Sequence, residues 1–222
     1  MQGLERNSRI TQTDIVGDYN KNLGYFIVKR VIDILGALCG ILLMGALMII
    51  VGIWIKVDSK GPVFFKQQRV GQNGKKFMMY KFRSMCTDAE KLLDKLQQKN
   101  EMSGPMFKIK EDPRITKIGR FIRKTSIDEL PQLINILKGE MSLVGPRPSL
   151  PKEVELFTSF QKRRLIAKPG LTCYWQVNGR SDVSFEQWME MDVQYLKDRN
   201  TFVDTGLILK TVGVLFGDEK AS

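Results

Sequence analysis

The feature that most constrains the fold is one long apolar run, VIDILGALCGILLMGALMIIVGIWI, from Val31 to Ile55. Its 25 residues include a single charged side chain, Asp33. A helix needs only about 20 apolar residues to cross a bilayer. A buried core helix is the alternative interpretation, but helices of globular proteins seldom stay apolar on every face over such a length. The run therefore predicts a membrane helix.

Basic residues flank this run on both sides. Because Lys and Arg are enriched at the cytoplasmic ends of membrane helices, both flanks are predicted to lie on the cytoplasmic side. A re-entrant helix, which enters and leaves on one face, satisfies both flanks, and Gly45 is its expected bend point because bending must keep the backbone groups paired. A straight spanning helix stays open, since the run contains no proline. The flanking residues are Lys21, Lys29 and Arg30 before the run, and Lys56, Lys60, Lys66 and Arg69 after it.

Composition limits the kinds of partner and chemistry. The chain has 222 residues, a formal net charge of +11 and no histidine. The charge indicates an anionic partner: nucleic acid, a lipid surface or a phosphorylated substrate. Catalysis by histidine is excluded. Three widely spaced cysteines, Cys39, Cys86 and Cys173, support neither a disulfide framework nor a zinc site and fit a reducing compartment.

Beyond the apolar run the sequence predicts a β-hairpin followed mostly by helices. Two strand-like stretches meet at Asn73-Gly74, a dipeptide suited to a tight turn. On the second strand, Lys81 and Arg83 are two residues apart and are expected to share a face. Helical patterns are expected over 87–100, 130–139, 153–164 and 185–199, and a short apolar strand between 170 and 178. The apolar stretch 203–216 is too short to span a membrane and is expected to lie in the interface or cover the core.

Two adjacent carboxylates, Asp128 and Glu129, stand in the stretch KTSIDELPQL, just before Pro131. Since proline is tolerated in a first helical turn, Asp128 is predicted as the N-cap and Glu129 as the first helical residue. Catalysis is the other interpretation, and the two are compatible. A carboxylate can accept a phosphoryl group as a nucleophile. One or two carboxylates together with substrate phosphate oxygens commonly hold Mg²⁺.

Two common phosphate-binding loop motifs, GxxxxGK[ST] and GxGxxG, are absent. Instead, isolated cations lie beside turns or at the ends of elements, and Arg147 stands between two prolines that fix its backbone. We expect these cations to converge on a diphosphate, which arginine can bind in a bidentate way. They are Lys81, Arg83, Arg123, Arg147 and Arg180.

Several long motifs in this order resemble the bacterial sugar transferase family, the monotopic phosphoglycosyl transferases. They are KRVID before the apolar run, GPVFFKQQRVGQNGKKFMMYKFRSM, DPRITKIGRFIRKTSIDELPQLINILKGEMSLVGPRP and KPGLTCYWQVNGRSD. The resemblance covers nearly all of 29–216. It implies transfer of a sugar 1-phosphate from a UDP-sugar to a polyprenyl phosphate, normally undecaprenyl phosphate, with release of UMP. Such a reaction begins the assembly of an exopolysaccharide, O-antigen or glycoprotein glycan.

The resemblance also implies residue roles. Asp128 matches the nucleophile of such enzymes, and Glu129 the residue that supports Mg²⁺, with Asp128 beside it. Asp204, in FVDTGLILKTV, matches a late aspartate of the family and is expected to bind substrate. The matching basic positions are Lys81, Arg123, Arg147 and Arg180. Relatives usually carry a proline at the re-entrant bend, where this chain has Met44-Gly45.

These observations together predict an α+β protein: mostly helical, monotopic, with a short β-hairpin and an N-terminal re-entrant membrane helix. We expect a polar segment over 1–28, the membrane helix over 29–56 and a catalytic domain with interfacial helices over 57–222. This would be the catalytic part alone, on the cytoplasmic face of a bacterial inner membrane, in contact with lipid and not with nucleic acid; a homodimer stays open. The sequence does not indicate which sugar is used.

Two other functions fit the residues. One is a membrane-attached binding module whose basic surface grips RNA or anionic lipid while the carboxylates only cap a helix. The other is a metal-dependent glycosyltransferase that releases UDP. The nucleotide product, UMP or UDP, separates the second from the phosphotransferase.

Overall fold

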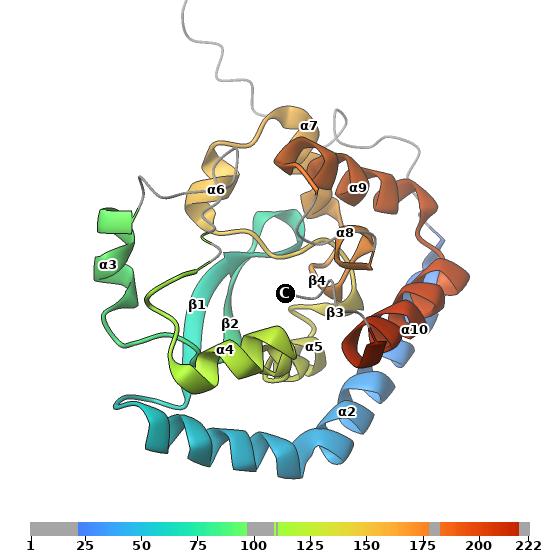
Figure 1. The fold of residues 1–222 in the computed structure, drawn as a ribbon. Coiled ribbons are helices and arrows are strands. Elements are labelled where there is room, and N and C mark those ends of the chain that lie inside the picture. Colours follow the sequence, from blue (N-terminus) through green and yellow to red (C-terminus); the bar gives the residue numbers. More distant parts are fainter. Residues whose placement is uncertain (1–21, 97–108, 110, 178–182, 218–222) are drawn as a thin grey trace, which may run out of the picture.

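The computed structural model describes residues 22–96, 109, 111–177 and 183–217, and within these the fold is mostly helical (Figure 1). Helices surround one antiparallel hairpin and a short parallel strand pair. The elements in chain order are α2 (Leu23–Asp58), β1 (Phe64–Val70), η1 (Gln72–Gly74), β2 (Lys76–Phe82), α3 (Ala89–Leu96), α4 (Lys117–Lys124), η3 (Ile127–Glu129), α5 (Gln132–Lys138), β3 (Ser142–Val144), α6 (Pro151–Glu155), α7 (Ser159–Lys162), η4 (Arg163–Ile166), β4 (Gly170–Thr172), α8 (Tyr174–Val177), α9 (Phe185–Asp198) and α10 (Thr201–Gly217).

The predicted membrane segment forms one continuous helix, α2, which begins earlier than the expected residue 29. Asn22 caps it, because the Asn22 side-chain oxygen accepts a hydrogen bond from the Gly24 amide at 2.9 Å. Among the described residues, α2 is the one helix long and apolar enough to cross a membrane. Its ribbon changes direction along its length (Figure 1), so that one half lies beside α10 and the other beside α4. The helix therefore wraps the domain rather than standing apart from it.

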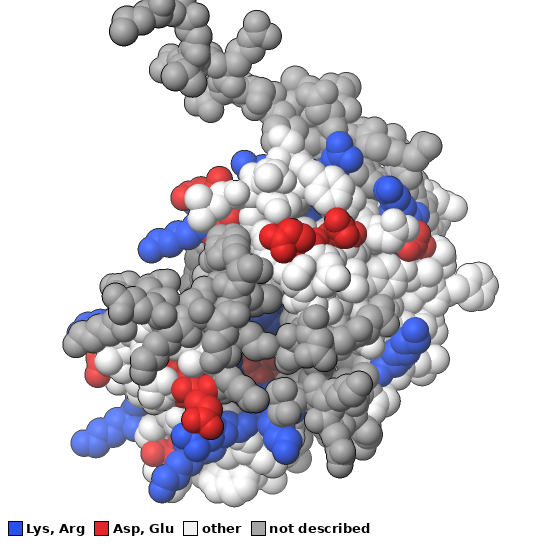
Figure 2. Space-filling view, turned by 45° about the horizontal axis from the view of Figure 1, so that its top comes forward, with Lys and Arg blue, Asp and Glu red and all other residues white. Residues whose placement is uncertain are grey.

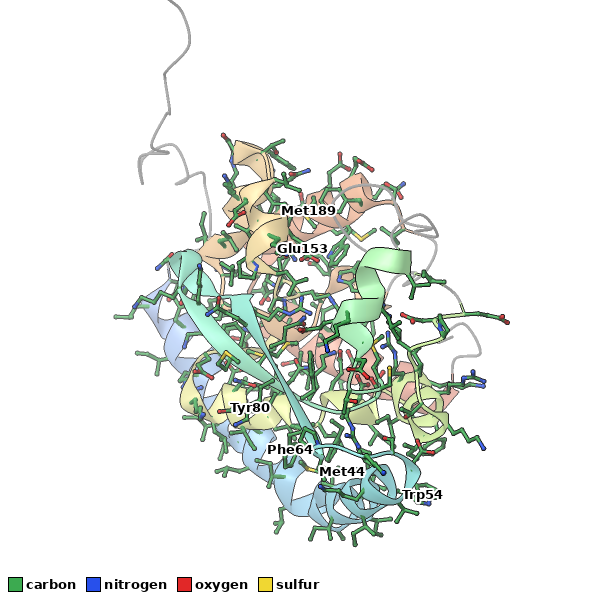
Figure 3. The ribbon with its side chains drawn as sticks, turned by 90° about the vertical axis from the view of Figure 1, so that its left-hand side faces the viewer. Met44, Trp54, Phe64, Tyr80, Glu153 and Met189 are labelled. Carbon is green, nitrogen blue, oxygen red and sulfur yellow. The ribbon has the colours of Figure 1, made fainter. Side chains whose placement is uncertain are left out.

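One side of α2 packs on the domain and the other is open. Ala37, Val51 and Ile55 are buried, whereas Leu42 is 83% exposed and Trp54 54%. Figure 3 shows side chains projecting from the outer side of α2, with Trp54 among them. Further exposed apolar residues lie on α2 and on the neighbouring α4 and α10: Leu23, Ile27, Val28, Val31, Leu35, Leu38, Leu43, Ile49, Ile50, Ile53, Val57, Phe121, Phe202, Leu209 and Val212. An apolar surface of this extent is typical of contact with lipid or with another protein.

The predicted hairpin is confirmed. Strands β1 and β2 pair antiparallel from Phe64–Phe82 to Val70–Lys76. The turn places Asn73 and Gly74 at positive φ, 54° and 77°, which is the conformation that this dipeptide tolerates. The inner face of β2 packs Phe77 and Met79 against α5. The hairpin therefore forms one wall behind the carboxylate pair.

Several helical predictions are confirmed in type and changed in extent. The patterns at 130–139 and 185–199 become α5 and α9, and Gly139 ends α5 in the left-handed conformation at φ 80°. The stretch 153–164 is divided among α6, α7 and η4 because Thr158 starts a new capped turn. The strand expected between 170 and 178 ends at Thr172, where α8 follows. The second strand pair, β3 with β4, is parallel.

Candidate active site

The carboxylate pair lies in a separate turn before α5, so the prediction that Asp128 is the N-cap of that helix is wrong. Asp128 and Glu129 belong to the 3-10 turn η3, while Pro131 stands at the N-cap position of α5. Proline has no amide hydrogen to donate to the Ile127 carbonyl, and the Leu130 amide bonds to that carbonyl instead, at 3.2 Å. This i to i+3 bond closes a 3-10 turn rather than an α-helical one.

Lys81 of β2 holds both carboxylates. Its Nζ lies 2.6 Å from Oε1 of Glu129 and 3.7 Å from Oδ2 of Asp128. All three side chains are largely buried, with exposed fractions of 16% for Lys81, 11% for Asp128 and 18% for Glu129. At such burial the attraction between opposite charges is screened much less than at the surface. Lys81 therefore lies within ion-pair distance of both carboxylates.

Arg147 also approaches Glu129. Its Nη1 lies 3.8 Å from Oε1 of Glu129, and its guanidinium lies 5.9 Å from the centre of the Trp175 ring. The Arg147 side chain is 35% exposed, which leaves it room to reach a ligand. The backbone of Arg147 is held in place, because the buried Arg164 donates a hydrogen bond to the Arg147 carbonyl at 2.7 Å. The fixed backbone of Arg147 agrees with the prediction from its two flanking prolines.

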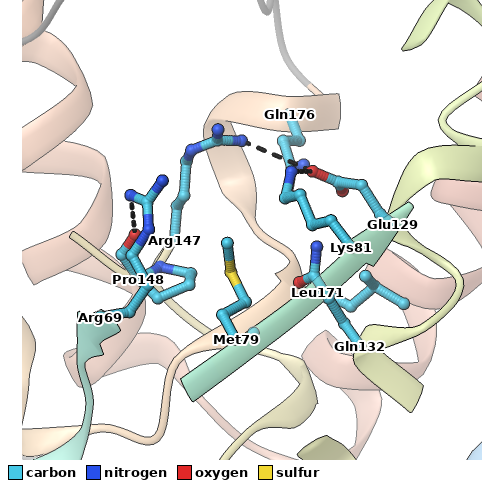
Figure 4. A pocket seen from close by; sticks show the side chains of 10 residues that line it. Arg69, Met79, Lys81, Glu129, Gln132, Arg147, Pro148, Leu171 and Gln176 are labelled. Atoms are coloured by element: carbon cyan, nitrogen blue, oxygen red, sulfur yellow. Dashed lines mark hydrogen bonds and ion pairs between the residues drawn. The ribbon is translucent and has the colours of Figure 1, made fainter. Parts of the chain in front are cut away.

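These side chains surround a pocket with an open volume of about 260 Å³ (Figure 4). Cations and Glu129 form its rim, while Met79, Leu171 and Pro148 supply apolar surface. The residues that line the pocket are Arg69, Met79, Lys81, Glu129, Gln132, Arg147, Pro148, Gly170, Leu171 and Gln176. The pocket therefore combines an ionic edge with an apolar interior, as small-molecule sites commonly do.

Sequence reasoning counted Arg69 only among the flanking cations and missed its place in the pocket. Arg69 donates to the Pro148 carbonyl at 3.0 Å and to Oε1 of Gln67 at 2.6 Å. Burial, with the nearby charge of Arg147, lowers the pKa of Arg69 to about 10, which leaves it charged near neutral pH. The signal that could have found Arg69 is its position in the alternation of the strand. Phe65, Gln67 and Arg69 lie on the same, less exposed face of β1, so the arginine points inward.

The environment of Asp128 acts on its pKa in two directions. Burial raises the pKa of Asp128, and the charge of Glu129 adds to that rise. Lys81 opposes it most strongly, followed by Arg123 and Arg147. The net effect is a raised pKa for Asp128, because burial together with Glu129 outweighs the cations, which favour the carboxylate form. Arg123 acts through its charge and is not among the residues that line the pocket.

Two expected substrate-binding residues, Arg83 and Asp204, are placed elsewhere. Arg83 follows β2, where its guanidinium donates to the carbonyls of Ser59 at 2.6 Å and of Ile55 at 3.3 Å. It therefore closes the C-terminal end of α2, because the last carbonyls of a helix have no partner within it. The expectation that Arg83 shares a binding face with Lys81 is corrected. Lys81 points to the carboxylate pair, whereas Arg83 points to the end of α2. Arg180 lies outside the described residues.

Asp204, on α10, lies in a buried polar cluster instead of lining the pocket. Its carboxylate accepts hydrogen bonds from the hydroxyls of Tyr25 at 2.9 Å and Tyr195 at 2.8 Å, and from Nζ of Lys29 at 2.8 Å. Lys29 also donates to the Val144 carbonyl. The expectation that Asp204 binds substrate is therefore corrected. Its carboxylate has a structural role and links α10 to α2 and α9.

Glu129 lines the pocket, whereas Asp128 is not among the lining residues but contacts Lys81, which is. The two adjacent carboxylates fit the donor set that Mg²⁺ prefers, provided that substrate phosphates supply further oxygens. Within the described residues no group of three or more His, Cys, Asp or Glu side chains gathers as a metal cage. The protein could therefore offer Asp128 and Glu129 to a cation that arrives with a phosphorylated ligand. As a class, this arrangement of carboxylates facing cations beside a long apolar helix is typical of a membrane-associated enzyme that handles phosphate esters.

Comparison with known proteins gives this class a family. A model of the bacterial sugar transferase family matches residues 24–218. The chain is 50% identical over 192 residues to the galactosyl transferase CpsE of Streptococcus agalactiae, covering 86% of this chain and 42% of that protein. It is 43% identical over 193 residues to the undecaprenyl-phosphate galactose phosphotransferase of Salmonella typhimurium, covering 85% and 40%. The chain therefore belongs to the bacterial sugar transferase family, and the resemblance seen in the sequence is confirmed.

The chain spans about two fifths of the length of these two relatives. A relative of similar size is the exopolysaccharide production protein ExoY of Rhizobium meliloti, which is 39% identical over 188 residues that cover 83% of each chain. The family match, over residues 24–218, includes the hairpin, the carboxylate pair and nearly all of α2.

Proposed function

We propose that this chain transfers a sugar 1-phosphate from a UDP-sugar to undecaprenyl phosphate and releases UMP. The product would be an undecaprenyl-diphosphate-sugar, the first membrane-bound intermediate of an exopolysaccharide, O-antigen or glycoconjugate. The relative named as an undecaprenyl-phosphate galactose phosphotransferase supports this reaction class. The observation that carries the proposal is the contact of Lys81 with both Asp128 and Glu129 at the edge of the pocket.

The proposed chemistry has two steps, with Asp128 as the nucleophile. In the first, a carboxylate oxygen of Asp128 bonds to the β-phosphorus of the UDP-sugar, and the bond from that phosphorus to the bridging oxygen breaks, so that UMP leaves with the oxygen. In the second, a phosphate oxygen of undecaprenyl phosphate bonds to the same phosphorus and the Asp128 carboxylate is released. Lys81 and Arg147 stabilise the negative charge that gathers on the phosphoryl oxygens.

Glu129 has a supporting role in this proposal. Together with Asp128 it would hold Mg²⁺, which supplies charge neutralisation to the diphosphate when bound. In the structure Glu129 is paired with Lys81 and lies near Arg147, so the two cations keep its carboxylate at the edge of the pocket. Because Glu129 follows the nucleophile directly, one 3-10 turn places both carboxylates beside Lys81.

In this proposal the apolar surface of α2 contacts the bilayer that holds the polyprenyl substrate. Undecaprenyl phosphate lies in a lipid bilayer, so its phosphate has to meet the carboxylate pair at the membrane surface. We propose that α2 is re-entrant and holds the site at the cytoplasmic face of the bacterial inner membrane. The bent path of α2 beneath the domain and the basic residues on both of its flanks support this arrangement (Figure 1).

The decisive experiment measures the nucleotide product. Purified chain in detergent or nanodiscs, given UDP-sugar, Mg²⁺ and undecaprenyl phosphate, is expected to release UMP. With UDP-sugar and Mg²⁺ alone, mass spectrometry should find a phosphosugar adduct on the peptide that contains Asp128. Asp128→Asn should abolish both signals. Full activity in that variant would exclude Asp128 as the nucleophile, and release of UDP would indicate a glycosyltransferase instead.

A basic binding module is the other candidate class, and one face of the molecule shows a charge pattern that argues against it. On the face in Figure 2, acidic side chains are interspersed with basic ones, whereas a nucleic-acid footprint is a basic patch or stripe. A binding module would retain RNA in a salt-dependent way and release no UMP. The same preparation can be tested for both outcomes.

A further inference from the structure

Gln132 is a largely buried residue whose amide lacks a hydrogen-bond partner. The residue is 3% exposed and lines the pocket. Figure 4 shows its side chain beside Leu171, reaching into the space below Lys81. In the part of the chain that the structure describes, its amide makes no hydrogen bond to another residue. Neither amide atom is fully buried, so the amide faces the pocket and is free to bind a ligand there.

Asn135, on the same helix, shows what a structural amide looks like in this fold. Asn135 is fully buried, and its side-chain oxygen accepts from the Tyr80 amide at 3.0 Å. Its side-chain nitrogen donates to the Met78 carbonyl at 2.8 Å and to Glu140 at 2.6 Å. Both amides lie on α5, yet the Asn135 amide has all its hydrogen bonds within the protein, whereas the Gln132 amide lines the pocket. Packing against β2 therefore accounts for Asn135 and not for Gln132.

We infer that Gln132 binds the sugar of the donor, by hydrogen bonds between its amide and a ring hydroxyl. A neutral amide offers donors and an acceptor together, which matches a hydroxyl, whereas the cations at the rim are better suited to phosphate. Met79 and Leu171 give apolar surface for the C–H groups of the ring.

The position of Gln132 in the chain agrees with this assignment. It stands three residues after Glu129, so it approaches the ligand from the same segment as the carboxylate pair. In the proposed reaction the sugar stays attached to the reacting phosphorus through both steps, while UMP leaves after the first. A contact to the sugar therefore serves both steps. This inference rests on the proposed function and deepens it, by naming the residue that reads the sugar.

The test compares donors that differ by one hydroxyl. UMP release by the unmodified chain is first measured with UDP-galactose, UDP-glucose, UDP-N-acetylglucosamine and UDP-N-acetylgalactosamine. For the best donor, each deoxy analogue is then compared in the unmodified chain and in Gln132→Met, which keeps the side-chain length and removes the amide. Gln68→Met is the matched control, because Gln68 is exposed on β1 and does not line the pocket.

We expect Gln132→Met to lower kcat/KM for the best donor by about 10- to 100-fold, and Gln68→Met to leave it unchanged. For the deoxy analogue that lacks the recognised hydroxyl, unmodified chain and Gln132→Met should differ much less. An equal loss for every donor and analogue would overturn the inference, since the amide would then act on the uridine or on the fold. Unchanged kcat/KM would overturn it as well.

Thermal unfolding in detergent checks that the variants fold. Gln132→Asn provides a second variant, which keeps the amide and withdraws it by one methylene group. If neither variant folds, Gln132 is a structural residue and the inference is wrong. Absence of UMP release from the unmodified chain with every donor would instead count against the proposed function, so the two failures can be told apart.

Discussion

The guanidinium of Arg164 donates a hydrogen bond to the main-chain carbonyl of Arg147, with 2.7 Å between Nη2 and the oxygen. The same Nη2 lies 2.6 Å from Oδ2 of Asp192, and both of these side chains are 1% exposed. Arg147 in turn lies 3.8 Å from Glu129. A buried ion pair thus supports, from within the core, the loop that carries one of the cations at the site.

Replacing Arg164 by Met should damage stability and activity together. The change leaves Asp192 buried without its cation, which typically costs about 3–5 kcal/mol. The loop carrying Arg147 also loses its support, and a misplaced catalytic group can lower kcat/KM by about 100-fold. Chemical unfolding in detergent and UMP release measure the two effects. Arg163→Met, one residue earlier and less buried, serves as the control. An unchanged unfolding midpoint in Arg164→Met would contradict the prediction.

The same ion pair predicts a dependence of stability on pH. Burial raises the pKa of Asp192 from 3.8 to about 6, with Arg164 acting in the opposite direction. Because the folded-state pKa lies above the unfolded one, the contribution of this group is fully present below pH 3.8 and is lost as the pH rises through about 6. Asp192→Asn cannot titrate. The free energy of unfolding of the unmodified chain, relative to that of the variant, should therefore fall by about 1–2 kcal/mol between pH 5 and pH 7.5. Parallel pH profiles would refute this.

Lys81 should be needed for catalysis beyond any part it has in folding. Lys81→Met removes the cation that contacts both carboxylates and, in the proposed reaction, the phosphoryl oxygens. We expect kcat/KM for UMP release to fall by about 100- to 1,000-fold, the usual effect of losing one group that stabilises developing charge. Lys76→Met, on the same strand but exposed, should keep near-normal activity. Comparable activity in the two variants would argue against a catalytic role for Lys81.

Local features were predictable from the sequence because their causes are local. The hairpin turn follows from the positive φ of Asn73 and Gly74, and the end of α5 from Gly139. The capping prediction for Asp128 failed for an equally local reason: Pro131 lacks the amide hydrogen that an α-helical first turn would use, so a 3-10 turn forms. Rules for proline in the first turn place the residue but do not decide the turn type.

Side chains whose partners come from distant segments were not predictable in this way. Arg83 and Asp204 were expected at the substrate, yet they bind the end of α2 and the cluster around Tyr25. Nothing in the spacing of either residue records that neighbour, because the contact exists only once α2 has wrapped around the domain. Gln132 was read as part of an apolar helix pattern, and only its unpaired amide in the folded chain draws attention to it.

Asp33 should act as a link between the membrane helix and the site. Its Oδ1 accepts hydrogen bonds from the Ser142 hydroxyl at 2.9 Å and the Leu143 amide at 2.8 Å, just before the loop that carries Arg147. Asp33→Leu leaves both donors buried and unpaired, which should destabilise the fold by about 2–4 kcal/mol. Asp33→Asn keeps an acceptor and should cost less, and Leu42→Ala, at a position 83% exposed, should cost little. Chemical unfolding in one detergent ranks the three, and an Asn variant as unstable as the Leu variant would be inconsistent with this role.

The topology of α2 gives the last prediction. If α2 is re-entrant, both of its ends lie in the cytoplasm, as the lysines and arginines on both flanks indicate. Single cysteines at Lys21→Cys and Lys60→Cys, in a chain whose own three cysteines are replaced, should react with a membrane-impermeant maleimide only after the cells are opened. A helix that crosses the bilayer would expose one of the two sites in intact cells. Since α2 is helical without interruption from Leu23 to Asp58, a re-entrant path has to come from bending and not from a break in the helix. Labelling of the same two sites in Gly45→Leu tests whether the bend needs a small residue at that position. A changed labelling pattern would show that it does, and an unchanged pattern that it does not.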